Sequence, residues 1–171
     1  MILLAVDTST RFAGVGVADG EVSRAARTWR SNQNHGRELM PAIVESLEEL
    51  SLSPKDITHL AVALGPGGFS AVRVGISCVL GLAVPKQLPV IGIPTHDVEF
   101  EPHRNLVSSD TPVYTLIPAG RNEVSWTRHV IDSEQKTGVA SPTELAQTLE
   151  PNALLCGEAC DLMTDHFKQS Q

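Results

Sequence analysis

The sequence has little positive charge, which limits the partners it can bind on its own. Its 171 residues hold 13 lysines and arginines against 20 aspartates and glutamates, so its formal net charge is -7. A chain that grips nucleic acid needs clustered Lys and Arg to neutralise phosphates, so we expect contact with RNA only through a partner protein. The 42% share of hydrophobic residues predicts a soluble globular protein with one domain or two small lobes.

Export and membrane signals are also missing. The opening "MILLAVDTST" has no basic n-region, and its apolar run stops at Asp7 after five residues. The longest nearly uncharged stretch, 57–85, is interrupted by His59, Arg73, two prolines and five glycines. We therefore expect a cytoplasmic protein that does not contact a membrane.

Cysteine is scarce, and metal and nucleophile motifs are absent. Cys78, Cys156 and Cys160 contain no C-x-x-C pair, which favours reduced, buried thiols over a disulfide or zinc framework. His35 would need a second histidine four residues later to form a metal site, but that position is Leu39. No G-x-S-x-G motif occurs, so a peptidase is the least favoured function.

The first 30 residues predict three consecutive antiparallel strands. Apolar runs at 2–6 and 13–18 flank the polar turn "TSTRF", and Asp19-Gly20 separates the second run from "EVSRAARTW" at 21–29. Asp-Gly between extended runs is typical of a two-residue turn in which both residues have positive φ.

Two helices and two more strands complete a first lobe. Residues 35–50 place apolar side chains on one helical stripe and glutamates on the other face, which predicts an amphipathic helix. Residues 70–84 are apolar nearly all round, with Arg73 as their only charge, which predicts a helix in the core or in a subunit interface. The apolar runs 60–64 and 88–93 predict buried strands.

The composition changes after Pro94. The range 95–111 is polar and has no sustained periodicity, so we expect a linker between a first lobe at 1–94 and a reduced second lobe at 112–171. Within the second lobe the sequence predicts strands at 113–117, 123–131 and 153–156, a helix with a capping box at Ser141 and Glu144, and a final helix after Gly157.

This order of elements predicts an α/β fold of the actin-like, or ribonuclease-H-like, class. Asp7 ends the first strand, where that architecture places its first functional acid. A two-metal nuclease would need carboxylates from neighbouring elements, and the strand at 60–64 carries none. An actin-like ATPase or small-molecule kinase, our alternative function, would need a second Asp-containing hairpin, and the matching "IPAGRNEV" at 117–124 has no Asp.

The stretch "GPGGFSAVRVG" at 65–75 has features of a phosphate-binding loop, because it leads into a helix N-terminus. It lacks the Gly-Lys-Ser/Thr of a P-loop, and Pro66 removes one donor, so a structural turn from strand to helix is favoured. A vestigial phosphate or anion loop would consist of Asp7, Thr8, Ser9, Gly65, Gly67, Gly68 and Arg73.

Together these motifs resemble the TsaB family, also called YeaZ. In that family a strand ending in "DTST", a helix starting near "H-x-x-x-L-x-P" and a loop-helix "GPGSFTGLRIG" follow one another. They correspond here to Asp7–Thr10, to "HGRELMP" at 35–41 and to the stretch at 65–75. The resemblance covers the first half of the chain and is fainter at "AGRNEVSW" and "LLCGEA".

The resemblance implies a non-catalytic subunit in the synthesis of threonylcarbamoyladenosine in tRNA. Such a subunit is an inactive paralogue of the transferase TsaD, which it binds and activates together with the ATPase TsaE. The resemblance also implies no cofactor on the isolated chain, ATP only in the complex, and a homodimer through the same helices when the chain is alone. The partner interface carried over consists of Leu39, Met40, Ile43, Val72, Ile76 and Val79.

Overall fold

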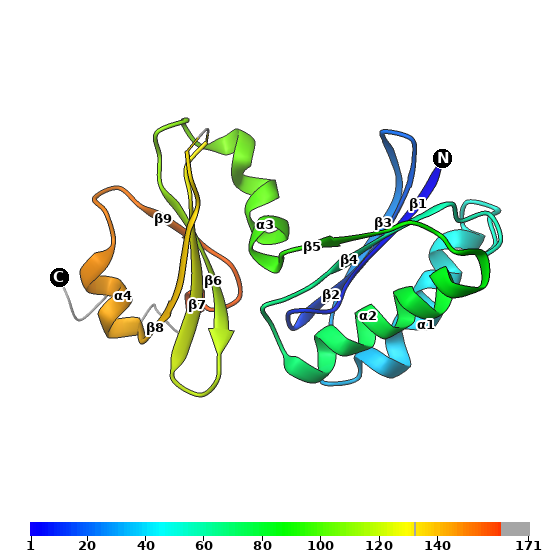
Figure 1. Ribbon diagram of the computed structural model, residues 1–171, viewed down its shortest axis with the longest axis horizontal. Coiled ribbons are helices and arrows are strands. Elements are labelled where there is room, and N and C mark those ends of the chain that lie inside the picture. The colour runs from blue at the N-terminus through cyan, green and yellow to red at the C-terminus, as the bar shows by residue number, and fades with distance from the viewer. Residues whose placement is uncertain (132, 162–171) are drawn as a thin grey trace. The chain divides into compact units, whose positions relative to one another are not determined.

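The structure is a computed structural model that describes residues 1–131 and 133–161. The chain divides into two units, Met1–Pro94 and Thr95–Gln171, each built around its own sheet (Figure 1). Most of the final helix expected after Gly157 would fall on residues 162–171, which lie outside the described ranges.

The first unit contains a five-stranded sheet in the order β3-β2-β1-β4-β5. The first three strands form an antiparallel meander, as predicted, and β4 and β5 run parallel to β1. β4 is buried as predicted, but β5 is an edge strand with Val90 and Ile91 exposed, because only one neighbour covers it. The strands span Ile2–Asp7 (β1), Phe12–Asp19 (β2), Val22–Arg30 (β3), His59–Ala63 (β4) and Val90–Ile93 (β5).

The turn between β2 and β3 differs from the expected Asp-Gly turn. Asp19 stays in the strand and pairs with Val22, so the two turn residues are Gly20 and Glu21. Only Gly20 has a positive φ, of 61°. The shift arises from a bulge in which Arg24 is the extra residue of β3, which brings Asp19 opposite Val22.

Two helices, α1 (His35–Glu48) and α2 (Phe69–Ala83), cover the same face of this sheet (Figure 1). A short 3-10 turn, η1 (Val84–Lys86), follows α2. Leu39, Ile43 and Leu47 lie four residues apart on α1 and are at most 1% exposed, as the amphipathic pattern predicts. Each fully buried side chain of this size contributes about 1.5–3 kcal/mol to folding.

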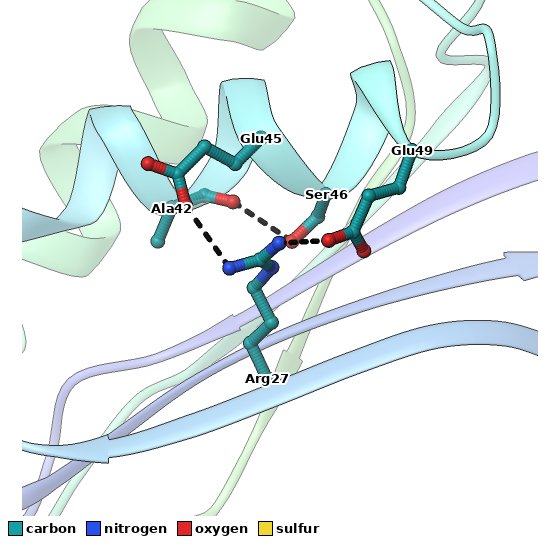
Figure 2. Close-up of polar contacts among 5 residues, drawn as sticks. All are labelled: Arg27, Ala42, Glu45, Ser46 and Glu49. Atoms are coloured by element: carbon teal, nitrogen blue, oxygen red, sulfur yellow. Dashed lines mark hydrogen bonds and ion pairs between the residues drawn. The ribbon is translucent and has the colours of Figure 1, made fainter.

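An ion-pair cluster ties α1 to the edge strand β3 (Figure 2). The Arg27 guanidinium donates to Glu45 at 3.0 Å and also to Glu49. Beneath it the buried Ser46 hydroxyl donates to the Ala42 carbonyl at 2.8 Å, so this polar atom is satisfied within the helix. Because both carboxylates are more than half exposed, each ion pair contributes at most about 1 kcal/mol.

The second unit contains a four-stranded sheet in the order β8-β7-β6-β9, in which β9 runs parallel to β6. The predicted capping box is confirmed, since the Ser141 side chain accepts from the Glu144 N–H and the Glu144 carboxylate accepts from the Ser141 N–H. The elements are α3 (Thr95–Phe100), the 3-10 turn η2 (Glu101–Leu106), β6 (Val113–Ala119), β7 (Glu123–His129), β8 (Lys136–Ala140), α4 (Pro142–Thr148) and β9 (Leu154–Cys156).

The second unit repeats the plan of the first. The series β6-β7-β8-α4-β9 has the same order as β1-β2-β3-α1-β4, with two antiparallel pairings and then a parallel strand beside the first. Duplication of such a unit is the architecture of actin-like proteins. The predicted α/β actin-like fold is therefore confirmed.

The range 95–111, expected as a linker, holds α3 and η2 within the second unit. Thr95, His96 and Phe100 are all at most 5% exposed, and the Phe100 ring stacks on the His129 ring at 4.3 Å. These residues are buried by contacts with strands distant in sequence, and α3 is too short to produce a periodic pattern.

Candidate functional site

The turn after β1 and the glycine loop after β4 lie in direct contact. The Asp7 carboxylate accepts from the Ser9 N–H at 2.7 Å and from the Ser9 hydroxyl at 2.6 Å. The Ser9 carbonyl in turn accepts from the Gly68 N–H at 3.0 Å. A Cβ on Gly67 would stand 2.0 Å from that carbonyl oxygen, so only glycine allows this approach.

Thr8 joins the same turn to α2. Its hydroxyl donates to the Ala71 carbonyl at 2.6 Å and accepts from the Gly75 N–H at 3.1 Å. An α-helix normally pairs those two backbone groups with each other, so the Thr8 side chain inserts into the helical ladder. A Cβ on Gly75 would lie 2.5 Å from the Thr8 hydroxyl oxygen, which explains the glycine in the middle of an apolar helix.

The expected anion loop is thus brought together in part. Asp7, Thr8, Ser9, Gly67 and Gly68 meet, and Gly65 packs beside Val72. Arg73 is exposed, and its guanidinium lies over the Phe69 ring at 5.0 Å from the centroid. The N–H groups of residues 9, 68 and 75 all donate to protein oxygens, so they do not point at an open phosphate position.

His35, at the start of α1, contacts the turn between β1 and β2. Its ring Nε2 lies 3.2 Å from the Thr10 carbonyl oxygen, and the side chain is 8% exposed. Among residues 1–131 and 133–161, no group of three or more His, Cys, Asp or Glu is placed to hold a metal ion. The histidine therefore anchors the start of α1 to the β1–β2 turn.

Exposed apolar side chains lie on α2 and directly after it, beside the exposed Arg73. Phe69, Leu80 and Val84 are 75%, 49% and 73% exposed. On α1 the Met40 side chain is 42% exposed, and its Sδ lies 3.4 Å from the Cys78 Sγ of α2. We call the exposed set Met40, Phe69, Leu80 and Val84 the apolar face.

The range Phe69–Lys86 has a mean hydropathy of 1.4 and is long and apolar enough to cross a membrane by length and composition. In α2 itself only Gly75, Val79 and Ala83 are buried, and the last two belong to the core of the first unit. Val74, Ile76, Cys78 and Leu82 also pack against that core while partly buried, so most of the apolar residues of this helix serve the core of the first unit.

The structure corrects half of the expected interface. Leu39, Ile43 and Val79 are at most 1% exposed inside the first unit, so their side chains cannot reach a partner. A helix that is apolar all round gives no signal of which side faces the core, so the sequence could not separate the two sides of α2. Met40, Val72 and Ile76 remain at or near the surface, and the exposed Phe69, Leu80 and Val84 were not in the expected set.

A buried polar cluster lies within the second unit. His96 of α3 places Nδ1 2.8 Å from the Thr115 hydroxyl and Nε2 3.0 Å from the Ser125 hydroxyl, and Thr115 also lies 3.1 Å from His129 Nε2. Burial and, to a smaller extent, the nearby His129 lower the pKa of His96 to about 4. Burial also lowers the pKa of His129. Both imidazoles are therefore neutral at pH 7 and link α3 to β6 and β7.

The two cysteines of the second unit are unreactive by the same argument. Burial raises the pKa of Cys156 to about 12 and that of Cys160 to about 11. Burial also raises the pKa of Cys78 on α2, which favours the neutral thiol. Nucleophilic chemistry requires the thiolate, which is scarce at neutral pH for all three side chains.

Comparison with known proteins identifies relatives of this arrangement. A family model described as TsaD, tRNA N6-adenosine threonylcarbamoyltransferase, matches residues 30–151. The tRNA threonylcarbamoyladenosine biosynthesis protein TsaB of Escherichia coli is 31% identical over 152 residues, which cover 88% of this chain and 63% of that protein. TsaB of Haemophilus influenzae is 36% identical over 94 residues, covering 54% of this chain and 39% of that protein.

Solved structures support the fold. YeaZ from Pseudomonas aeruginosa superposes with a TM-score of 0.78 at 24% identity, covering 91% of this chain and 75% of that chain. The chain spans less than two thirds of the length of the curated relatives given above.

Proposed function

The chain belongs to the TsaB (YeaZ) family, and on that premise we propose that it is a non-catalytic subunit for threonylcarbamoyladenosine modification of tRNA. In this role it binds a TsaD-type transferase and activates it. The apolar face of α1 and α2 is the contact surface. This exposed face is the observation that carries the proposal.

The closed turn around Ser9 supports a binding role over nucleotide chemistry. A phosphate cradle needs free backbone N–H groups, whereas here Ser9, Gly68 and Gly75 donate to protein oxygens. In the second unit the corresponding hairpin, between β6 and β7, has no Asp. An actin-like ATPase or small-molecule kinase, the competing function, would need both lobes to hold magnesium and triphosphate.

The remaining partners follow from the same role. We infer that ATP enters only with the assembled complex, in which a TsaE-type ATPase takes part, and that tRNA is met in that complex. Without the transferase, the apolar face pairs with a second copy of the chain. Each of these assemblies removes apolar side chains from water, which is the main favourable contribution to protein association.

The experiment changes one exposed apolar side chain of the face, Leu80. Leu80→Asp places a charge where the partner would bury it, and burial of an unpaired carboxylate costs several kcal/mol. We expect the affinity for the transferase, measured by isothermal titration calorimetry, to fall at least about tenfold, which corresponds to about 1.4 kcal/mol.

The matched control is Val22→Asp at the start of β3. Val22 is 57% exposed, close to the 49% of Leu80, and lies on the other edge of the first sheet from α2. We expect this variant to bind the transferase like the unchanged chain. Equal affinities of the Leu80→Asp variant and the unchanged chain would remove the apolar face from the proposal.

A further inference from the structure

Two sulfur atoms lie in contact between α1 and α2. The Met40 Sδ of α1 lies 3.4 Å from the Cys78 Sγ of α2, and the thiol is placed to donate to the thioether. One helical turn earlier on both helices, Gly36 faces Val74, since a Cβ on Gly36 would lie 4.0 Å from the Val74 Cγ2. The packing of the two helices along this row therefore holds the sulfur atoms together.

The two sulfur side chains differ in exposure. Cys78 packs against the core of the first unit while partly buried. Met40 is 42% exposed and belongs to the apolar face. The thioether is therefore the more accessible of the two groups to a small oxidant in water.

The two groups also differ in their reactivity toward hydrogen peroxide. A thiol reacts as its thiolate, and burial raises the pKa of Cys78, so this side chain stays protonated at neutral pH. A thioether has no proton to lose, so its oxidation does not depend on a pKa. The Met40 Sδ lone pair attacks one peroxide oxygen, the O–O bond breaks, an S–O bond forms, and water leaves. The thioether is oxidised to the sulfoxide, and the peroxide is reduced to water.

We propose that Met40 is an oxidation site that controls assembly through the apolar face. Its sulfoxide oxygen is a polar acceptor, which water and the adjacent Cys78 thiol satisfy in the free chain. An apolar partner surface displaces that water, and a polar group buried without its hydrogen bonds weakens binding. Hydrogen peroxide therefore lowers the affinity of the face for its partner, and a methionine sulfoxide reductase reverses the change.

The effect on assembly rests on the proposed function, because it requires a partner that buries the apolar face. The site of oxidation does not, because it follows from the exposure and the chemistry of the two sulfur groups. The two parts of the proposal are therefore measured separately.

The first measurement is peptide mass spectrometry of the full chain after treatment with hydrogen peroxide. Met1, which is 59% exposed, is the internal reference. We expect Met40 to gain an oxygen atom at a rate within about threefold of the rate at Met1, because susceptibility follows exposure, and Cys78 to remain a free thiol. A slower rate at Met40 than this, or oxidation of Cys78 before Met40, overturns the oxidation site.

The second measurement is the affinity for the TsaD-type transferase before and after peroxide treatment, by isothermal titration calorimetry. We expect the treatment to weaken binding about 5- to 150-fold, the effect of one polar group left unpaired on burial. Met40→Leu removes the sulfur and keeps an apolar side chain of similar size, so the ratio of the two affinities should be about 1 in this variant. Methionine sulfoxide reductase should restore the affinity of the treated, unsubstituted chain.

The matched controls remove other sulfur atoms. Met163→Leu makes the same substitution at a methionine outside the described residues, and Cys78→Ala removes the neighbouring thiol. Both variants should keep the response to peroxide. The proposal is overturned if Met40→Leu keeps the full response, or if either control loses it.

A failure of the proposed function gives a different result. If the untreated chain does not bind the transferase, the proposed contact fails and the effect on assembly fails with it, while mass spectrometry still decides the oxidation site. If the untreated chain binds and oxidation of Met40 leaves the affinity unchanged, the transferase contact stands and the controlling role of Met40 is overturned.

Discussion

Among single residues, Thr8 determines how the first turn meets α2. Its side chain is 1% exposed. Its hydroxyl donates to the Ala71 carbonyl and accepts from the Gly75 N–H, two groups that are four residues apart in the helix. Neither partner can move without breaking a buried hydrogen bond, so the space at Gly75 is rigid. A glycine that costs helix propensity is thereby retained in the middle of α2.

Two glycines of α2 provide a matched pair of substitutions. Gly75→Ala puts a Cβ 2.5 Å from the Thr8 hydroxyl, so we expect a loss of about 1–3 kcal/mol in the free energy of unfolding. Gly81→Ala meets nothing within 4 Å, and we expect a gain of about 0.5–1 kcal/mol from helix propensity. Urea unfolding followed by circular dichroism measures both. If both variants gain stability, Thr8 does not constrain the helix.

The sequence predicted which residues meet at this turn, but it did not predict the hydrogen bonds between them. The "DTST" and glycine motifs marked Asp7, Ser9 and Gly67 as neighbours in space, because a strand end and a strand-to-helix loop meet at the same sheet edge. The sequence could not show that Thr8 enters the helical ladder, since that depends on the approach of two segments more than 60 residues apart.

Among the elements, α3 is held by polar contacts more than by an apolar stripe. His96 uses both ring nitrogens on the hydroxyls of Thr115 and Ser125, and the Phe100 ring stacks on His129. The neutral ring accepts at one nitrogen, and a protonated ring donates at both. Protonation also places a positive charge beside His129 in a buried site, which favours release of α3.

The attachment of α3 therefore depends on pH in a defined direction. The pKa of His96 is about 4 in the folded chain, below its ordinary value of 6.5, so the unfolded chain binds more protons between these values. The contribution of His96 is complete above about pH 6.5 and decreases as the pH falls toward 4. We expect a loss of about 2 to 3 kcal/mol over this range.

The comparison uses His96→Gln, which keeps a neutral polar side chain at every pH. Other groups near the pair also titrate or carry charge, because Asp97 raises the pKa of both histidines and Arg104 lowers that of His129. The measured quantity is therefore the difference in unfolding free energy between the two chains, by urea at pH 7.5 and pH 5. A difference that does not change with pH contradicts the role of His96.

The elements differed in how well the sequence predicted them. The meander, α1 and the capped helix α4 carry period-2, period-3.6 and capping signals, and they were confirmed. β5 was taken as buried because it is apolar, although it lies at an edge. α3 had no local signal, since its buried residues are polar or isolated and make their contacts with β6 and β7.

At the scale of the whole molecule, both units repeat the β-β-β-α-β order, and this shared fold does not by itself determine the function. The two units share the framework of actin-like proteins; in the first unit the Asp7 carboxylate accepts from the Ser9 N–H, and in the second the matching hairpin contains no Asp. A scaffold needs only the fold and an exposed surface. The apolar face of α1 and α2 provides such a surface, and its residues are the ones to change when assembly is tested.

The most direct measurement is size-exclusion chromatography with light scattering. The chain would be mixed with the TsaD-type transferase from the same source, with and without magnesium and ATP. Our account predicts a heterodimer of one chain and one transferase whose mass does not depend on nucleotide. The absence of any complex, together with ATP binding and hydrolysis by the isolated chain, would contradict the account and support an actin-like enzyme.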